Sequence, residues 1–152
     1  ASSHHPFRIP QEYNDVFLGG SGEIHKCVQY TDHALQQFFN YAGKQPWYNN
    51  TLFVITADHT NKCYDERYKT SSGIMEVPII FFHPNGEAPF EPGIDSTMIA
   101  QQIDIMPTVL EYAGYEKPFI AFGKSLISTS AADSYAVNYN NETYSYYKSK
   151  PW

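Results

Sequence analysis

Cysteine is scarce in this chain of 152 residues, where only Cys27 and Cys63 occur. The spacing of the two residues matches no metal-binding or redox motif, which argues against a cysteine-based zinc site or a dithiol redox protein. One disulfide between them would be chemically allowed. We expect two free, buried thiols instead.

Long apolar runs and basic side chains are also few. No run approaches the roughly 20 apolar residues of a membrane-spanning helix, and no signal-peptide pattern opens the sequence. Lysine and arginine number 10 against 16 acidic residues, so the formal net charge is -6. Binding to nucleic acid or to anionic membranes requires a clustered basic surface. The negative net charge therefore argues against either as the main partner. An anionic substrate would have to be held by a few local groups.

The composition that remains is that of a globular domain. Hydrophobic residues make up 42% of the chain, aromatic residues 16% and charged residues 17%, which argues against disorder. The length fits one domain of ordinary size. Because the first residues, ASSHHPF, already carry several potentially functional side chains, we expect the chain to be a piece of a longer protein.

Residues 51–60, TLFVITADHT, form the motif around which the rest is arranged. Residues 52–55 are apolar without alternation, which predicts a strand covered on both faces. The run leads to Asp58 and His59. Because open α/β sheets bind ligands at the carboxyl ends of their strands, this pair is the best candidate for metal ligation. The alternative, that Asp58 caps the next turn and His59 is a solvated surface residue, stays open on residue types alone.

The segments around this motif predict a layered α/β protein. Apolar residues recur at steps of three and four from residue 23 to 42, which predicts an amphipathic helix that ends at Gly43. His25, Asp32 and His33 do not share one stripe of that helix, and we interpret them as polar-face or capping residues. Residues 77–82, VPIIFF, predict a second buried strand.

The C-terminal third combines helical and strand patterns. We predict one helical segment over residues 96–103 and another that begins at Asp104, its N-cap, and ends before Gly114. Tyr135, Val137 and Tyr139 alternate along residues 135–147, and Tyr144 and Tyr146 resume the alternation after Asn140 and Asn141. This pattern predicts a β-hairpin attached to the edge of the α/β part.

Two further groups of residues are candidates for substrate binding. The polar stretch at residues 60–72 carries Lys62, Arg67 and Lys69, and one of these cations could hold a phosphate or sulfate. An exposed charged loop is more often only solvated surface. The pair His4 and His5 near the start is likewise more often solvated than functional.

The blocks SSHHPF, YTDHALQQFF, TLFVITADHT, KTSSGIMEVPIIFF, QQIDIMPTVLEYAGY and AFGKSL, in this order, resemble the C-terminal half of a sulfatase-type member of the alkaline phosphatase superfamily. The resemblance is strongest to the branch of lipoteichoic acid synthases and phosphoglycerol transferases. It implies an α/β fold, with a partial alkaline phosphatase-like layered sheet, flanking helices and a C-terminal β-hairpin. It also implies that residues 1–152 belong to one catalytic domain, with the α/β part at 1–130 and a hairpin subregion at 131–152.

The resemblance implies roles for single residues. Asp58 and His59 match the family's Asp-His pair that binds a catalytic divalent metal, and this donor set suits zinc or manganese better than magnesium or calcium. His4 resembles a histidine that contacts the substrate head group. Lys69 lies near the position of a substrate-binding lysine of sulfatases, although the spacing departs from their pattern. The family's nucleophile, a Thr, Ser or modified Cys, lies further N-terminal, so no catalytic residue is assigned.

The function implied is that of a metal-dependent hydrolase or transferase that acts on phosphate or sulfate esters through a covalent enzyme ester. Phosphoglycerol transferase-like and sulfatase-like activities fit, a sulfatase proper is an alternative, and a non-catalytic cell-envelope domain is another. We expect these residues alone to be inactive and to need the missing N-terminal half of the domain. The expected location is extracytoplasmic, with any membrane anchor in a segment outside these residues.

Overall fold

The computed structural model describes residues 3–20, 22–61, 63, 65–140 and 142–148. The chain forms two compact units, residues 1–51 and residues 52–152, and each is considered separately. The predicted subdivision at residues 130 and 131 stays a prediction.

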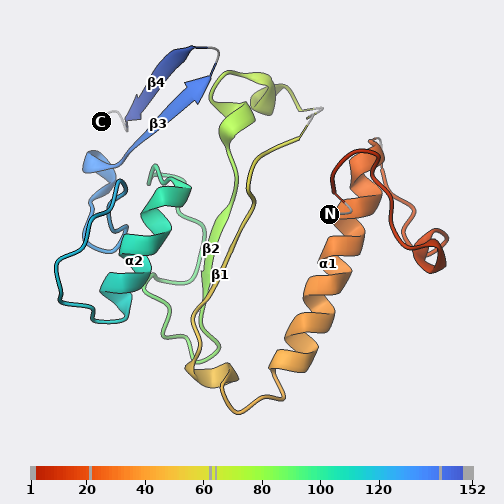
Figure 1. Cartoon of the computed structure of the whole chain (residues 1–152), viewed down its shortest axis with the longest axis horizontal. Coiled ribbons are helices and arrows are strands. Elements are labelled where there is room, and N and C mark those ends of the chain that lie inside the picture. Colours follow the sequence, from red (N-terminus) through yellow and green to blue (C-terminus); the bar gives the residue numbers. More distant parts are fainter. Residues whose placement is uncertain (1–2, 21, 62, 64, 141, 149–152) are drawn as a thin grey trace. The chain divides into compact units, whose positions relative to one another are not determined.

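The first unit is built on helix α1, Glu23–Ala42, whose bounds confirm the predicted ones (Figure 1). The helix begins where His25 Nδ1 accepts a hydrogen bond from the Gly22 N–H at 3.2 Å, so the capping role predicted for His25 is confirmed. His33 instead packs its ring 5.6 Å from the rings of both Tyr13 and Phe17, between the helix and the preceding loop. Its assignment to a polar face was therefore wrong, because aromatic residues of the loop cover that side.

The apolar stripe of α1 is only partly covered. Cys27 and Ala42 are fully buried, whereas Val28 is 53% and Phe38 45% exposed. The periodicity thus predicts the helix correctly, but only part of the predicted stripe, such as Ala42, is buried. Burial raises the pKa of the Cys27 thiol.

The second unit contains a ribbon of two antiparallel strands, β1 Phe53–Thr56 and β2 Ile79–Phe82 (Figure 1). Both lie at the predicted places. The register sets Phe53 opposite Phe82 and Thr56 opposite Ile79, so the start of β2 lies beside the end of β1. β1 is half-buried rather than covered on both faces, and it pairs with one strand in the described part of its sheet. Alternating exposure along β2 is typical of such antiparallel pairs.

Helix α2, Ile105–Tyr112, follows as predicted and ends before Gly114, whose φ is +68°. The helix predicted at residues 96–103 was wrong. Asp95 Oδ1 accepts hydrogen bonds from the backbone N–H groups of Thr97 (2.7 Å) and Met98 (3.1 Å). This local turn competes with helix formation. Short 3-10 turns complete the chain: η1 Gln11–Tyr13, η2 Tyr48–Asn50, η3 Glu66–Lys69, η4 Gly73–Met75, η5 Gln102–Asp104 and η6 Ala131–Asp133.

Asp104 occupies the predicted N-cap position, but its carboxylate does not cap α2. The residue is fully buried, and its two carboxylate oxygens accept hydrogen bonds from the backbone N–H groups of Gln101 and Lys124, both at 2.9 Å. Its carbonyl accepts one from the hydroxyl of Thr108 at 2.6 Å, which in turn accepts the Leu126 N–H at 3.0 Å. Asp104 therefore ties α2 to residues 124–126.

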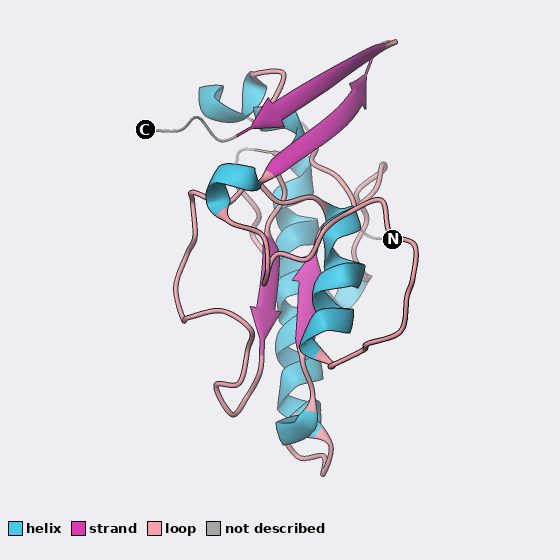
Figure 2. Ribbon diagram, turned by 90° about the vertical axis from the view of Figure 1, so that its left-hand side faces the viewer, coloured by secondary structure: helices cyan, strands magenta, loops and turns pink. Residues whose placement is uncertain are grey.

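The predicted hairpin is confirmed as β3, Tyr135–Asn140, and β4, Thr143–Lys148 (Figure 2). It forms a sheet separate from β1 and β2. Side chains attach it instead: Gln101 Nε2 donates to the Tyr135 carbonyl (3.1 Å), and the Val137 N–H donates to Gln101 Oε1 (2.9 Å). Lys124 Nζ lies 3.3 Å from the centre of the Tyr135 ring. Burial lowers the pKa of Lys124, while the carboxylates of Asp104 and Asp133 oppose that shift.

The two cysteines are free, as predicted, although Cys63 is only half-buried. None of the helices formed by the described residues has the length and apolar character needed to cross a bilayer.

Candidate metal site

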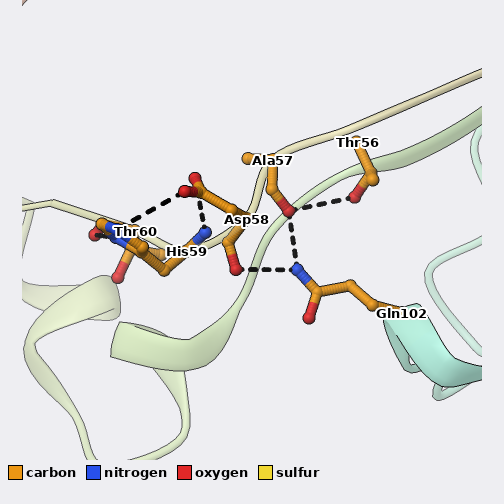
Figure 3. Close-up of polar contacts among 6 residues, drawn as sticks. All are labelled: Thr56, Ala57, Asp58, His59, Thr60 and Gln102. Carbon is orange, nitrogen blue, oxygen red and sulfur yellow. Dashed lines mark hydrogen bonds and ion pairs between the residues drawn. The ribbon is translucent and has the colours of Figure 1, made fainter. Parts of the chain in front are cut away.

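The candidate site lies where β1 ends. The Thr56 hydroxyl donates to the Pro78 carbonyl at 2.8 Å, just before β2, and so closes the end of the ribbon. Ala57, Asp58 and His59 then leave the ribbon and enter the loop (Figure 3). The strand therefore determines where the carboxylate and the imidazole emerge.

Asp58 and His59 approach each other (Figure 3). Asp58 Oδ2 lies 3.7 Å from His59 Nε2, and Asp58 Oδ1 accepts the His59 backbone N–H at 3.0 Å. The two side chains are 89% and 70% exposed, respectively. Both therefore remain accessible to a ligand from solvent.

The orientation of the His59 ring suits metal ligation. Nδ1 lies 2.6 Å from the Thr60 carbonyl, which can only accept a hydrogen bond, so Nδ1 carries the proton. In the neutral ring this leaves the Nε2 lone pair on the side of Asp58. Metal-bound histidines commonly donate their second N–H to a carbonyl or carboxylate in this way. The Thr60 hydroxyl in turn donates to the Ile74 carbonyl, which holds the segment against η4.

The separation of the two donors fits one shared ion. Two ligands about 2.1 Å from a tetrahedral zinc ion are about 3.4 Å apart. The observed 3.7 Å differs by a few tenths of an ångström, within reach of a small rotation of the exposed Asp58 side chain. In the described part of the chain, no group of three or more His, Cys, Asp and Glu side chains could hold a metal. A catalytic zinc site has about three protein ligands, so the pair alone would not complete one.

The Asp58 carboxylate also fits the alternative interpretation in part. One of its oxygens bonds the next backbone N–H, as a turn-forming residue would, and His59 is largely exposed. The second oxygen, Oδ2, has no such role and faces His59 Nε2. The ligand assignment of both residues stays a prediction.

The loop cations are already paired with carboxylates. Lys69, in η3, forms an ion pair with Glu66, and Arg67 lies 3.5 Å from Glu76. Lys62 lies outside the described residues. An anion that binds Lys69 would therefore compete with Glu66 for its positive charge. The role of Lys69 in substrate binding stays a prediction.

His4 belongs to the first unit, whereas Asp58 and His59 belong to the second. Its side chain is exposed, with Nδ1 3.1 Å from the His5 carbonyl. Its contact with a substrate stays a prediction.

Sequence reasoning missed Gln102. Its Nε2 donates to the carbonyls of Ala57 (2.6 Å) and Asp58 (2.8 Å), directly behind the candidate ligands (Figure 3). The block QQID contains it, but no local pattern connects an amide to a strand end 44 residues earlier in the chain.

Residues 1–115 match the family model named Sulfatase. The chain belongs to the sulfatase family. Among the relatives of this sulfatase-family chain are the lipoteichoic acid synthases of Staphylococcus aureus strains USA300 and NCTC 8325 / PS 47. Each is 25% identical to it over 84% of this chain and 22% of the relative.

A solved structure has the same fold. It is a protein in the alkaline phosphatase superfamily from Vibrio parahaemolyticus, with a TM-score of 0.77 and 24% identity over 97% of this chain and 35% of that protein. This structure confirms the predicted fold class, and the match to the Sulfatase model confirms the predicted family. The chain spans only about a fifth of the length of the lipoteichoic acid synthases that it matches.

Proposed function

We propose that this chain is part of the catalytic domain of a metal-dependent enzyme that transfers or hydrolyses phosphate or sulfate esters. The observation that carries the proposal is the Asp58–His59 pair, with donor atoms 3.7 Å apart at the end of β1, in a chain of the sulfatase family. Carboxylate and imidazole groups are donors that suit zinc and manganese, and strand ends of open α/β sheets are common ligand sites.

Asp58 and His59 would hold zinc or manganese in preference to magnesium or calcium. When bound, the ion supplies a Lewis acid that activates a hydroxyl nucleophile and neutralises charge on the transferred group. The chain's own contribution is orientation, since the Thr60 carbonyl fixes the protonated nitrogen of His59 and so directs Nε2 outward. His4 would donate a hydrogen bond to the substrate head group, and Lys69 would pair with the anion in exchange for Glu66.

The substrate class follows from the relatives. Similarity to lipoteichoic acid synthases favours a phosphodiester and a transfer of phosphoglycerol type. The match to the Sulfatase model keeps a sulfatase proper as the second candidate. Both would proceed through a covalent enzyme ester, whose nucleophile is not among the assigned residues.

The partner implied is the remainder of the catalytic domain. The assigned ligands number two, and the apolar stripe of α1 is partly uncovered, so further segments would complete both the site and the core. By analogy with an enzyme that makes lipoteichoic acid, we place the activity on the outer side of the cytoplasmic membrane, with any anchor outside residues 1–152.

Calorimetric titration of the protein with Zn²⁺ and Mn²⁺ tests the metal site. We expect binding weaker than about 1 µM, because only two ligands are supplied, and we expect Asp58→Ala and His59→Ala each to abolish it. Glu91→Ala, which removes an exposed carboxylate elsewhere, is the control and should bind metal as the wild type does.

Two results would contradict this. Metal binding that persists in both Asp58→Ala and His59→Ala would show that the pair is not the site. Submicromolar binding that Asp58→Ala removes would show that no further segment is needed for metal affinity.

A further inference from the structure

The adjacent side chains of Gln101 and Gln102 form hydrogen bonds to two different parts of the second unit. The amide nitrogen of Gln102 donates to two successive backbone carbonyls, those of Ala57 and Asp58. An amide group has two N–H donors, and Gln102 uses both here. The amide of Gln101 instead bonds Tyr135 and Val137 of β3.

The backbone of both glutamines is held in place by the buried Asp104. Gln102 begins η5, which ends at the fully buried Asp104. The Asp104 carboxylate accepts the Gln101 N–H at 2.9 Å, so the backbone from which both side chains extend is fixed to the interior. Gln102 therefore links the end of β1 to backbone that the buried Asp104 holds in place.

The two carbonyls that Gln102 binds belong to the peptide planes on either side of Asp58. Each residue has only two soft dihedral angles, which set its preceding and following peptide planes relative to each other. Holding both planes to one nitrogen atom therefore restricts both angles of Asp58. The direction of the Asp58 side chain, and the position of the His59 backbone N–H that bonds it, follow from those angles.

We propose that Gln102 is a positioning residue for the Asp58–His59 pair, which it pre-orders for a shared divalent cation without touching that cation. The proposal rests on the metal-binding role proposed above for Asp58 and His59. Gln101, one residue earlier, has no part in it.

The test compares Gln102→Met with Gln101→Met. Methionine keeps the length of the side chain and removes its hydrogen bonds, so each variant deprives a different set of backbone groups of their partner. The first measurement is made without metal, as the heteronuclear NOE of the backbone amides. We expect it to fall at Asp58 and His59 in Gln102→Met and to remain unchanged there in Gln101→Met.

The second measurement is a Zn²⁺ titration followed by the chemical shifts of the His59 ring. We expect Gln102→Met to weaken binding about tenfold, the lower end of the effect of losing a partner that orients a metal ligand. Gln101→Met should bind as the wild type does. If Gln102→Met fails to fold by circular dichroism, Gln102→Asn replaces it, because it keeps the amide but is one methylene too short to reach both carbonyls.

Each contrary result is distinguishable. Unchanged affinity in a folded Gln102 variant, with or without a lower NOE, would overturn the positioning role and leave the metal site intact. Equal losses in the Gln101 and Gln102 variants would also overturn it, because general destabilisation would then explain both. Zinc shifts that Asp58→Ala does not remove would overturn the metal site itself, and this inference with it.

Discussion

Asp104 shows how one buried side chain organises its surroundings. A buried carboxylate is unfavourable unless its oxygens are hydrogen-bonded, and here both oxygens accept backbone N–H groups. The neighbouring loop is packed equally closely, because a Cβ added to Gly123 would lie 2.2 Å from the Ile103 carbonyl oxygen and 2.6 Å from Asp104 Oδ1. The block AFGKSL thus needs its glycine for close approach.

Asp104→Ala should lower the free energy of unfolding by about 2–4 kcal/mol. It leaves two buried N–H groups without a hydrogen-bond partner and creates a small cavity. Urea denaturation followed by circular dichroism measures the change. Asp95→Ala is the matched control, since Asp95 also accepts backbone N–H bonds but is exposed. It should cost less than about 1 kcal/mol. Equal effects of the two substitutions would refute the special role of burial.

The hydrogen bonds of Asp95 make the stability of the protein depend on pH. The Thr97 hydroxyl, together with the backbone N–H groups of Thr97 and Met98, holds the pKa of this carboxyl below its ordinary value. A lowered pKa in the folded state contributes stability that is present above the unfolded pKa of about 3.9 and is lost as the pH falls through the lowered value. Carboxyl ¹³C NMR titration should show the low pKa, and Thr97→Val should move it upward. Ser96→Ala, the control, should leave it in place.

Among the elements, the hairpin carries cross-strand aromatic pairs in addition to its backbone pairing. Tyr139 and Tyr144 face each other with ring centres 4.8 Å apart, and the rings of Tyr135 and Tyr146 stack at 5.5 Å. Cross-strand aromatic pairs of this kind stabilise a ribbon even where it is exposed. The Gln101 amide then attaches the hairpin to η5.

The tight turn of the hairpin contains a strained residue. Glu142 has φ +60°, a conformation that favours glycine over residues with a Cβ atom. Glu142→Gly should therefore stabilise the protein by about 0.5–1 kcal/mol, after allowance for the added freedom of the unfolded chain. Thermal denaturation measures it. Glu87→Gly in an exposed loop, the control, should give no stabilisation, and a loss of stability in Glu142→Gly would contradict the argument.

For the chain as a whole, the described residues bury little apolar surface. The buried hydrophobic residues are Cys27, Ala42 and Leu126, whereas Ile94 and Phe122 are more than 90% exposed. Exposed apolar surface of this extent commonly marks an interaction surface. This agrees with the proposal that further parts of a sulfatase domain cover it.

The protein by itself should therefore bind the dye ANS at neutral pH, with a rise in fluorescence. Replacing Val28 and Phe38 together by glutamine should reduce that signal, because about half of each side chain is exposed on α1. Replacing Gln36 and Gln37 by alanine on the same helix is the control and should not reduce it. Absence of dye binding in the wild type would show that these apolar residues are covered.

Local patterns in the sequence were enough to place α1, α2, the β1 and β2 segments and the hairpin, because helices and hairpins are formed by residues close together in the chain. The order of short motifs likewise identified the family, and Asp58 and His59 were recognisable as a pair because they are neighbours. Long-range contacts were not readable in this way. The antiparallel pairing of β1 with β2, the burial of Asp104 and the Gln102 bonds to Ala57 and Asp58 each join residues 20 or more positions apart. Such contacts depend on how the elements pack, so they emerge only once the chain is folded.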